Sequence, residues 1–93
     1  MPVTVYIPTP FRRATGNRDR VDVPAGDVAG VLDEIERQHS GLRGLVRDET
    51  GEVHRHVNVY VNSQAIEDLE GLRTRVKDGD EVAIIPALAG GRS

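Results

Sequence analysis

The sequence predicts an α+β roll, a single domain in which one main helix covers one face of a small mixed sheet. With 93 residues, the chain is long enough for one hydrophobic core and too short for two. Only one stretch has the spacing of a long amphipathic helix, whereas several short runs rich in valine and isoleucine alternate like strands. In chain order these segments read strand, strand, helix, strand, short strand, strand, which predicts four to five strands and an open opposite face.

The first two strands are predicted at Val3–Ile7 and Arg20–Val23. Both runs are rich in β-branched residues, and a proline follows each of them, where the missing N–H stops sheet pairing. The segment 11–17 between them is expected to be a loop or a wide hairpin connection, because it closes on Gly16-Asn17. The arginines of this region are expected to face solvent at a hairpin edge, since the aspartates among them weaken any phosphate site.

The main helix is predicted to begin after Asp27, whose carboxylate suits the free N–H groups of a first helical turn. The apolar residues that follow recur at the spacing of one helical face: Val28, Val31, Leu32 and Ile35. Asp33 and Arg37 are expected to pair across one turn on the solvent side. Gly30 predicts a close approach to a neighbour, at a cost of about 1 kcal/mol relative to alanine. Ser40-Gly41 is the expected stop.

The second half of the chain supplies the remaining strands. Residues 42–52 are glycine-punctuated and charged, which predicts a short helical turn followed by a loop. Val57–Val61 has valine at every second position and is the clearest strand in the sequence. Asn62-Ser63 predicts a tight turn into a short return strand over residues 64–66.

The last strand follows a strong turn signal. Residues 67–76 are expected to be irregular or one-turn helical and to direct three apolar side chains inward: Leu69, Leu72 and Val76. Lys77–Asp80 has a glycine between two aspartates, which predicts a tight turn. Glu81–Ile85 then has the pattern of a strand that ends at Pro86, because proline has no N–H for a sheet ladder.

Apolar side chains occupy both faces of this last strand. Val82 and Ile84 fall on one face, whereas Ala83 and Ile85 fall on the other. One pair must face the helix and the core, and the other must be covered by loops or form an apolar patch on the open face. From the sequence, Ile85 is either buried in the core or part of a surface that docks a partner. Ala83 lies on the same face and is assigned to partner docking as well.

Composition argues against several classes of function. The chain has no cysteine, so it forms no disulfide, thioester or thiolate metal site of its own. Its formal net charge of −3 argues against a general nucleic-acid binder and against adhesion to an anionic membrane. No signal peptide or membrane-spanning run is recognisable, so the cytoplasm is the expected location. His54 and His56 are too few ligands for zinc, and no catalytic residue, metal site or bound cofactor is predicted.

Residues 1–86 are expected to form the folded domain and residues 87–93 a flexible C-terminal tail. The tail has too little apolar surface to offset the entropy of ordering. Gly90 and Gly91 have no Cβ, so their backbone fits a narrow channel that other residues would not enter. Such a tail suits insertion into another protein's active site, with Leu88 as an anchor in the partner's channel.

The C-terminal region resembles the signature of the ubiquitin-like sulfur carriers, the MoaD/ThiS family. The residues that carry the resemblance are Asp78-Gly79-Asp80-Glu81-Val82-Ala83-Ile84-Ile85-Pro86-Ala87-Leu88-Ala89-Gly90-Gly91. The stretch 54–62 also resembles that family, and the alanine-rich ending is most similar to the carriers of cysteine biosynthesis. The resemblance covers essentially the whole chain, and it implies the β-grasp fold.

The resemblance implies a covalent sulfur carrier rather than an enzyme. Gly91, once terminal, would offer its carboxylate to a ubiquitin-activating-like adenylyltransferase that uses ATP. Sulfur would then replace the adenylate to give a Gly91 thiocarboxylate. A sulfur-accepting synthase would use that sulfur to make cysteine, molybdopterin, thiamin or a sulfur-containing secondary metabolite. The residues implied to thread into the partner are Pro86, Ala87, Leu88, Ala89 and Gly90.

Arg92 and Ser93 depart from the family pattern, in which carriers ordinarily end at Gly-Gly. With these residues attached Gly91 has no free carboxylate, so we expect a JAMM-type metalloprotease to cut between Gly91 and Arg92. A remnant of an expression fusion is the other origin of such a polar end. Two further functions stay open: a ubiquitin-like modifier that joins Gly91 to lysines of target proteins, and a non-catalytic interaction domain that does not need Gly90-Gly91.

Overall fold

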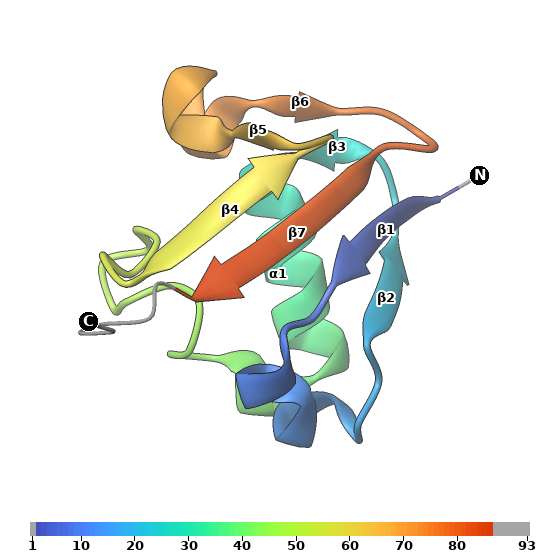
Figure 1. Ribbon diagram of the computed structural model, residues 1–93, viewed down its shortest axis with the longest axis vertical. Coiled ribbons are helices and arrows are strands. Elements are labelled where there is room, and N and C mark those ends of the chain that lie inside the picture. The colour runs from blue at the N-terminus through green and yellow to red at the C-terminus, as the bar shows by residue number, and fades with distance from the viewer. Residues whose placement is uncertain (1, 87–93) are drawn as a thin grey trace.

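The computed structural model describes residues 2–86 of the chain. Within this range a five-stranded sheet lies against one α-helix (Figure 1). The strands of this sheet, in spatial order, are β2 (Arg20–Val23), β1 (Val3–Tyr6), β7 (Glu81–Pro86), β4 (Val57–Val61) and β5 (Gln64–Ala65). The helix is α1 (Val28–Gln38), and a smaller sheet pairs β3 (Gly26–Asp27) with β6 (Arg75–Val76). Short 3-10 helices connect these elements: η1 (Thr9–Thr15), η2 (Ser40–Leu42), η3 (Ile66–Asp68) and η4 (Gly71–Arg73).

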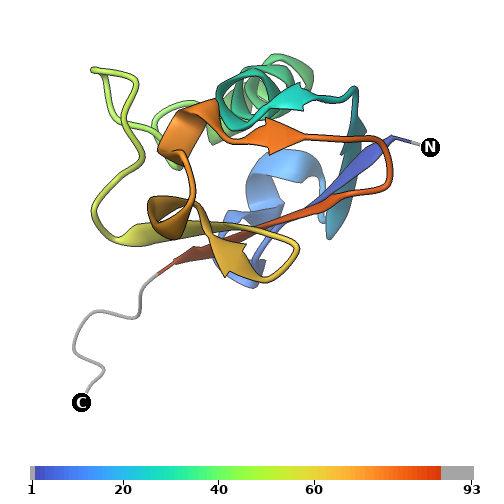
Figure 2. The same cartoon turned by 90° about the horizontal axis from the view of Figure 1, so that it is seen from above.

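β7 is the central strand of the larger sheet, although it is the last strand in the sequence. It pairs in parallel with β1 and antiparallel with β4, while β1 pairs antiparallel with β2. The chain between the parallel strands includes α1, which covers one face of the sheet (Figure 2). A mixed sheet with this strand order and one covering helix is the β-grasp, or ubiquitin-like, fold. The predicted fold class is therefore confirmed.

The alternation of the strands and the apolar stripe of the helix build one core of aliphatic side chains. The inward residues of the two central parallel strands are Val3, Val5, Val82 and Ile84, all at most 2% exposed. α1 contributes the predicted stripe, whose members are all buried: Val28, Val31, Leu32 and Ile35. Burying one such side chain stabilises the fold by about 1.5–3 kcal/mol relative to exposure. This face of the sheet is therefore held firmly against the helix.

The helix begins where the sequence predicts. Asp27 accepts a hydrogen bond from the backbone N–H of Gly30 at 2.8 Å. A Cβ on Gly30 would lie 3.2 Å from that carboxylate oxygen, so the close neighbour that this glycine allows is the helix's own cap. α1 ends at Gln38, just before the predicted stop, and the chain continues into η2. There Gly41 allows a close approach to η1, because a Cβ on it would lie 3.1 Å from the Cβ of Ala14.

The expected pairing of Asp33 with Arg37 is wrong. Arg37 instead donates to both carboxylate oxygens of Glu34, one turn before it on the helix. Asp33 accepts from the guanidinium of Arg47 at 2.6 Å. Spacing along a helix predicts only which side chains of that helix can reach one another. Here Arg47, from the loop after the helix, binds the carboxylate of Asp33 instead.

Some short segments also differ from the prediction. The predicted wide connection between the antiparallel strands β1 and β2 is present, but it contains the 3-10 helix η1, which was not predicted. Leu69 is 37% exposed rather than inward, whereas Val76 is buried as predicted and Leu72 packs at the edge of the core. The pairing of β3 with β6 was not predicted. Two-residue strands and single 3-10 turns are too short to show a hydrophobic period, which explains these errors.

β7 continues through Pro86, one residue beyond its predicted end. Pro86 lies opposite Val57 of β4. Farther along this antiparallel ladder, the backbone N–H of Asn62 donates to the carbonyl oxygen of Glu81 at 2.8 Å. In such a ladder, hydrogen-bonded pairs alternate with non-hydrogen-bonded pairs. Asn62 and Glu81 form a hydrogen-bonded pair, so Val57 and Pro86, five positions farther along, form a non-hydrogen-bonded pair. The missing N–H of the proline therefore costs the ladder with β4 no hydrogen bond.

At the opposite end of the sheet, the turn after β4 is hydrogen-bonded to the turn before β7. Asn62 and Ser63, with positive φ of 48° and 73°, form the predicted tight turn after β4. The side chain of Asn62 donates to Asp80 at 3.0 Å and accepts from the N–H of Glu81 at 2.9 Å. The other oxygen of Asp80 accepts the N–H of Lys77 at 2.8 Å, and these two bonds, chiefly the one from Lys77, lower the pKa of the Asp80 carboxyl. We call this arrangement the Asn62–Asp80 clamp, and it fixes where β7 begins.

Replacing Asp80 with asparagine is expected to destabilise the domain by about 0.5–1 kcal/mol, because one amide cannot accept hydrogen bonds from both of its present donors. A carboxyl whose pKa is lowered by folding stabilises the fold above its unfolded-state pKa, and this stabilisation is lost as the pH falls through the folded-state value. In urea unfolding, D80N should therefore be less stable than the wild type near neutral pH, and the difference should shrink in acid, as the pH falls through the lowered pKa of Asp80. Equal stability at neutral pH would contradict the role of the clamp.

Candidate functional site

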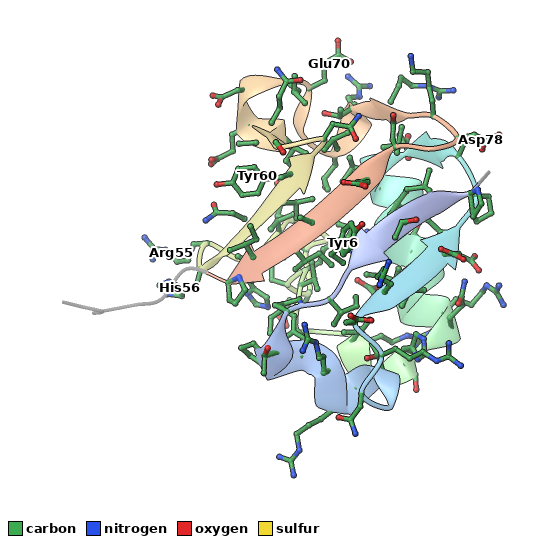
Figure 3. The ribbon with its side chains drawn as sticks, turned by 45° about the vertical axis from the view of Figure 1, so that its right-hand side comes forward. Tyr6, Arg55, His56, Tyr60, Glu70 and Asp78 are labelled. Atoms are coloured by element: carbon green, nitrogen blue, oxygen red, sulfur yellow. The ribbon has the colours of Figure 1, made fainter. Side chains whose placement is uncertain are left out.

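The face of the sheet that α1 leaves uncovered has an apolar strip along β7. The register places Ala83 between Tyr6 of β1 and Tyr60 of β4. Figure 3 shows these two tyrosines on the strands that flank β7. Ile85 follows on the same face and is 48% exposed. We call Tyr6, Tyr60, Ala83 and Ile85 the open-face patch.

The two isoleucines of β7 have opposite environments. Ile84 is 2% exposed and belongs to the core, whereas Ile85 is 48% exposed. The sequence left open which pair faces inward, and the structure directs Val82 and Ile84 to the helix and Ala83 and Ile85 to the open face. The outward pair therefore forms the predicted apolar patch, and its role in docking a partner stays a prediction.

Polar groups surround this patch. The hydroxyl of Tyr6 donates to a carboxylate oxygen of Glu81 at 3.3 Å. The guanidinium carbon of Arg20 lies 5.9 Å from the centre of the Tyr6 ring, within the range of a cation–π interaction. An apolar centre with aromatic neighbours and a polar rim is typical of protein–protein interfaces. The open face is therefore suited to contact with another protein.

Pro86 is the last residue that the structure describes. The residues to which the sequence assigns reaction, threading and processing therefore lie outside the described range: Ala87, Leu88, Ala89, Gly90, Gly91 and Arg92, with Ser93 after them. Their roles stay predictions. Pro86, which the sequence places with the threading residues, belongs to β7. The tail is thus attached to the end of the central strand of the sheet.

Sequence reasoning missed an ion-pair cluster that anchors the loop between α1 and β4. The guanidinium of Arg47 donates to Asp33 at 2.6 Å and to the two oxygens of Glu36 at 2.9 and 3.0 Å. The side chains of Arg47 and Glu36 are both 14% exposed, and hydrogen bonding to Glu36 raises the pKa of the arginine. Farther along, a ring nitrogen of His54 lies 2.8 Å from the carbonyl oxygen of Gly44. An arginine in a glycine-rich segment gives no sequence signal that specifies such partners.

The remaining polar candidates have structural partners or form no cluster. Within residues 2–86, no three histidine, cysteine or acidic side chains lie close enough together to hold a metal ion. Glu34 and Glu36 of α1 bind separate arginines, Arg37 and Arg47. Over the same range, no helix has the length and apolar character needed to cross a membrane.

Comparison with known proteins covers the domain together with its tail. Residues 5–91 match the ThiS family. The sulfur carrier protein CysO of Mycobacterium tuberculosis is 40% identical over 93 residues, which cover 98% of this chain and 100% of that protein. The crystal structure of M. tuberculosis CysO, described as an antigen, has a TM-score of 0.86 at 38% identity and covers 92% of this chain and 99% of that chain.

Two further relatives differ in what their names describe. A chain in the crystal structure of the Amycolatopsis orientalis BexX/CysO complex is 40% identical, with a TM-score of 0.88 and coverage of 96% of this chain and 99% of that one. The small archaeal modifier protein 3 of Haloferax volcanii is 41% identical over 85 residues, covering 87% of this chain and 89% of that protein.

The fold and the C-terminal signature define the class of this protein, a β-grasp carrier domain of the ubiquitin-like type. Within that class, the chain belongs to the ThiS family of sulfur carrier proteins. Members of this family are substrates of partner enzymes rather than enzymes.

The neighbours Ile84 and Ile85 provide a matched test of the two faces of β7. Ile84→Ala is expected to lower the free energy of unfolding by about 2–4 kcal/mol, because it leaves a cavity in the core. Ile85→Ala is expected to lower it by less than about 1 kcal/mol, since its side chain is already half in water. Urea denaturation measures both values. A loss for Ile85→Ala as large as that for Ile84→Ala would place Ile85 in the core and remove it from the open-face patch.

Proposed function

We propose that this protein carries sulfur as a thiocarboxylate on Gly91 and donates it in the biosynthesis of a sulfur-containing small molecule. The observation that carries this proposal is the match to the ThiS family, which runs through Gly91. The product is cysteine, molybdopterin, thiamin or a secondary metabolite, and the likeness of the ending to cysteine-biosynthesis carriers favours cysteine. We place the reaction in the cytoplasm.

The chemistry takes place on the α-carboxylate of Gly91. Its attack on the α-phosphorus of ATP, bound by the partner adenylyltransferase, forms an acyl adenylate and releases pyrophosphate. Hydrosulfide then attacks the carboxyl carbon, AMP leaves with the bond electrons, and a proton is lost to give the thiocarboxylate. The chain has no cysteine, so any persulfide or thioester on this route belongs to partner residues.

The position of the open-face patch suits a partner that receives the tail. Ile85 immediately precedes Pro86, so the patch and the tail are continuous along β7. The segment from Ala87 to Gly91 spans at most about 16–18 Å when fully extended. A partner must therefore sit against this end of the sheet for its active site to reach Gly91. We assign Ala83 and Ile85 to that contact and the following residues to threading: Pro86, Ala87, Leu88, Ala89 and Gly90.

Removal of Arg92 must come before activation. Arg92 follows Gly91 in the chain, so the carboxyl group of Gly91 is part of a peptide bond. We assign hydrolysis of the Gly91–Arg92 bond to a JAMM-type metalloprotease. The hydroxyl of water then joins the Gly91 carbonyl carbon, and Arg92 leaves with a free amine. Arg92 and Ser93 in this view protect the carrier from premature activation.

A second function is favoured by the likeness to the Haloferax volcanii modifier protein. The activated carbonyl of Gly91 would then form an isopeptide bond with a lysine amine of a target protein, and the activating group would leave. Activation is common to both functions, so they differ only in the nucleophile and the product.

A chain ending at Gly91 is expected to become a thiocarboxylate when incubated with its adenylyltransferase, ATP and a sulfide source. Its intact mass should rise by the difference between sulfur and oxygen, whereas a control chain ending at Gly90 should not change. Addition of each sulfur-accepting synthase of the same cells then identifies the acceptor by loss of that mass. C-terminal peptides of this chain joined through Gly91 to lysines of other proteins, without any thiocarboxylate, would instead support the modifier function. Unchanged function after deletion of Gly90-Gly91 would contradict both.

The protein isolated from its own cells is expected to end at Gly91. Intact mass spectrometry of the thiocarboxylated pool measures this directly, and a metalloprotease inhibitor should shift the pool toward the uncut form. Thiocarboxylated protein that still contains Arg92 and Ser93 would show that the proposed cleavage is wrong.

A further inference from the structure

The charged side chains of the domain are separated along β7. The turns and loops near the start of the strand are mainly acidic, with Glu67, Asp68, Glu70, Asp78, Asp80 and Glu81 against Arg73, Arg75 and Lys77. The segments near its end have Arg12, Arg13, Arg18, Arg20 and Arg55 against Asp19, and the loop that leads to Arg55 also contains Asp48, Glu49 and Glu52. Figure 3 shows Glu70 and Asp78 at one end of the domain and Arg55 and His56 at the other. The formal net charge of the chain is −3, so the sign of the charge at the basic end is opposite to that of the whole chain.

Two basic residues border the end of β7 on the β4 side. Val57, the first residue of β4, lies opposite Pro86. Arg55 and His56 immediately precede it and are both exposed. Figure 3 places their side chains beside the end of β7. They therefore lie next to the point at which the tail is attached.

A third basic residue lies on the β1 side. β1 runs parallel to β7, with Tyr6 opposite Ala83, so both strands end on the same side of the domain. Arg12 follows in η1, and its Nε donates to the carbonyl oxygen of Ile7 at 3.2 Å. This bond holds the guanidinium at the end of β1, on the side of β2, because the N–H of the same Ile7 donates to Asp19. We call Arg55 and His56 the tail-root collar, and Arg12 adds a positive charge farther from the tail.

Arg55 of the collar and Arg12 have no acidic partner among residues 2–86. Within this range neither arginine has a carboxylate within ion-pair distance, in contrast to Arg37 and Arg47. The loop with acidic residues 48–52 rises on the α1 side, away from the end of β7 (Figure 2). The positive charge of Arg55 is therefore available to a molecule that approaches the root of the tail.

We propose that the tail-root collar binds an acidic surface at the mouth of the channel through which the adenylyltransferase receives the tail. This inference rests on the proposed function, in which the tail enters that enzyme from the end of β7. Opposite charges at an interface steer the encounter and set its orientation more than they add affinity. The same acidic surface repels the far end of the domain. The collar and the acidic end together orient the carrier so that the tail arrives first.

Arg55→Glu, with Arg73→Glu as its matched control, tests this inference. Both arginines are exposed, both substitutions change the net charge equally, and Arg73 lies in η4 at the acidic end. Each variant is made in the chain ending at Gly91 and assayed by ATP–pyrophosphate exchange with the adenylyltransferase of the same cells. R55E is expected to raise KM about tenfold at low salt with kcat unchanged, and R73E to change KM less than about twofold. High salt should reduce the R55E effect to about twofold, because it screens exposed charges.

The outcomes separate the inference from the proposed function. Equal KM values for R55E and R73E, or an R55E effect that does not depend on salt, overturn the collar while leaving the proposed function intact. Wild-type chain that drives no exchange overturns the proposed function and this inference with it. Thermal unfolding of each variant detects a folding defect. If R55E is less stable than R73E, R55Q takes its place, with an expected KM increase of about threefold at low salt.

Discussion

The pairing of β7 between β1 and β4 is the interaction on which the rest of this structure depends. It joins the last described strand to the first, and its inward residues Val82 and Ile84 complete the core against α1. The Asn62–Asp80 clamp fixes the start of the strand, β1 pairs with residues 81–83, and β4 pairs with residues 82–86. The tail therefore begins at a point that the most enclosed strand of the sheet holds in place. Under the proposed function, the Gly91 carboxyl group has a defined reach because the residue that precedes the tail is held in the sheet.

One strand thus serves both stability and contact. Alternation along β7 sends one pair of apolar side chains into the core and the other pair, Ala83 and Ile85, onto the open face. A register slip of one residue would exchange these faces and would bring Pro86, without an N–H, into a hydrogen-bonded position opposite β4. The clamp and the proline therefore specify the same register from the two ends of the strand.

The loop between α1 and β4 connects the helix side of the domain with the root of the tail. Arg47 ties this loop to Asp33 and Glu36 of α1, and His54 contacts the backbone of Gly44. Because such contacts reduce the freedom of the loop, Arg55 and His56 are presented beside the end of β7 rather than at the tip of a long mobile segment. The ion pairs of Arg47 with α1 thereby help to hold the loop that presents Arg55 and His56.

The sequence by itself determined the local features: the N-cap at Asp27, the buried stripe of α1, the strand at Val57–Val61, the turn at Asn62-Ser63 and the Gly-Gly signature. Each of these depends on residues a few positions apart, whose spacing sets backbone hydrogen bonding and facing direction. Only the tertiary structure decided that Ile84 is buried and Ile85 exposed, that Arg47 rather than Arg37 binds Asp33, and that Arg55 and His56 lie beside the end of β7. These choices join residues far apart in the chain, so they follow from the placement of whole elements around β7, which no local pattern specifies.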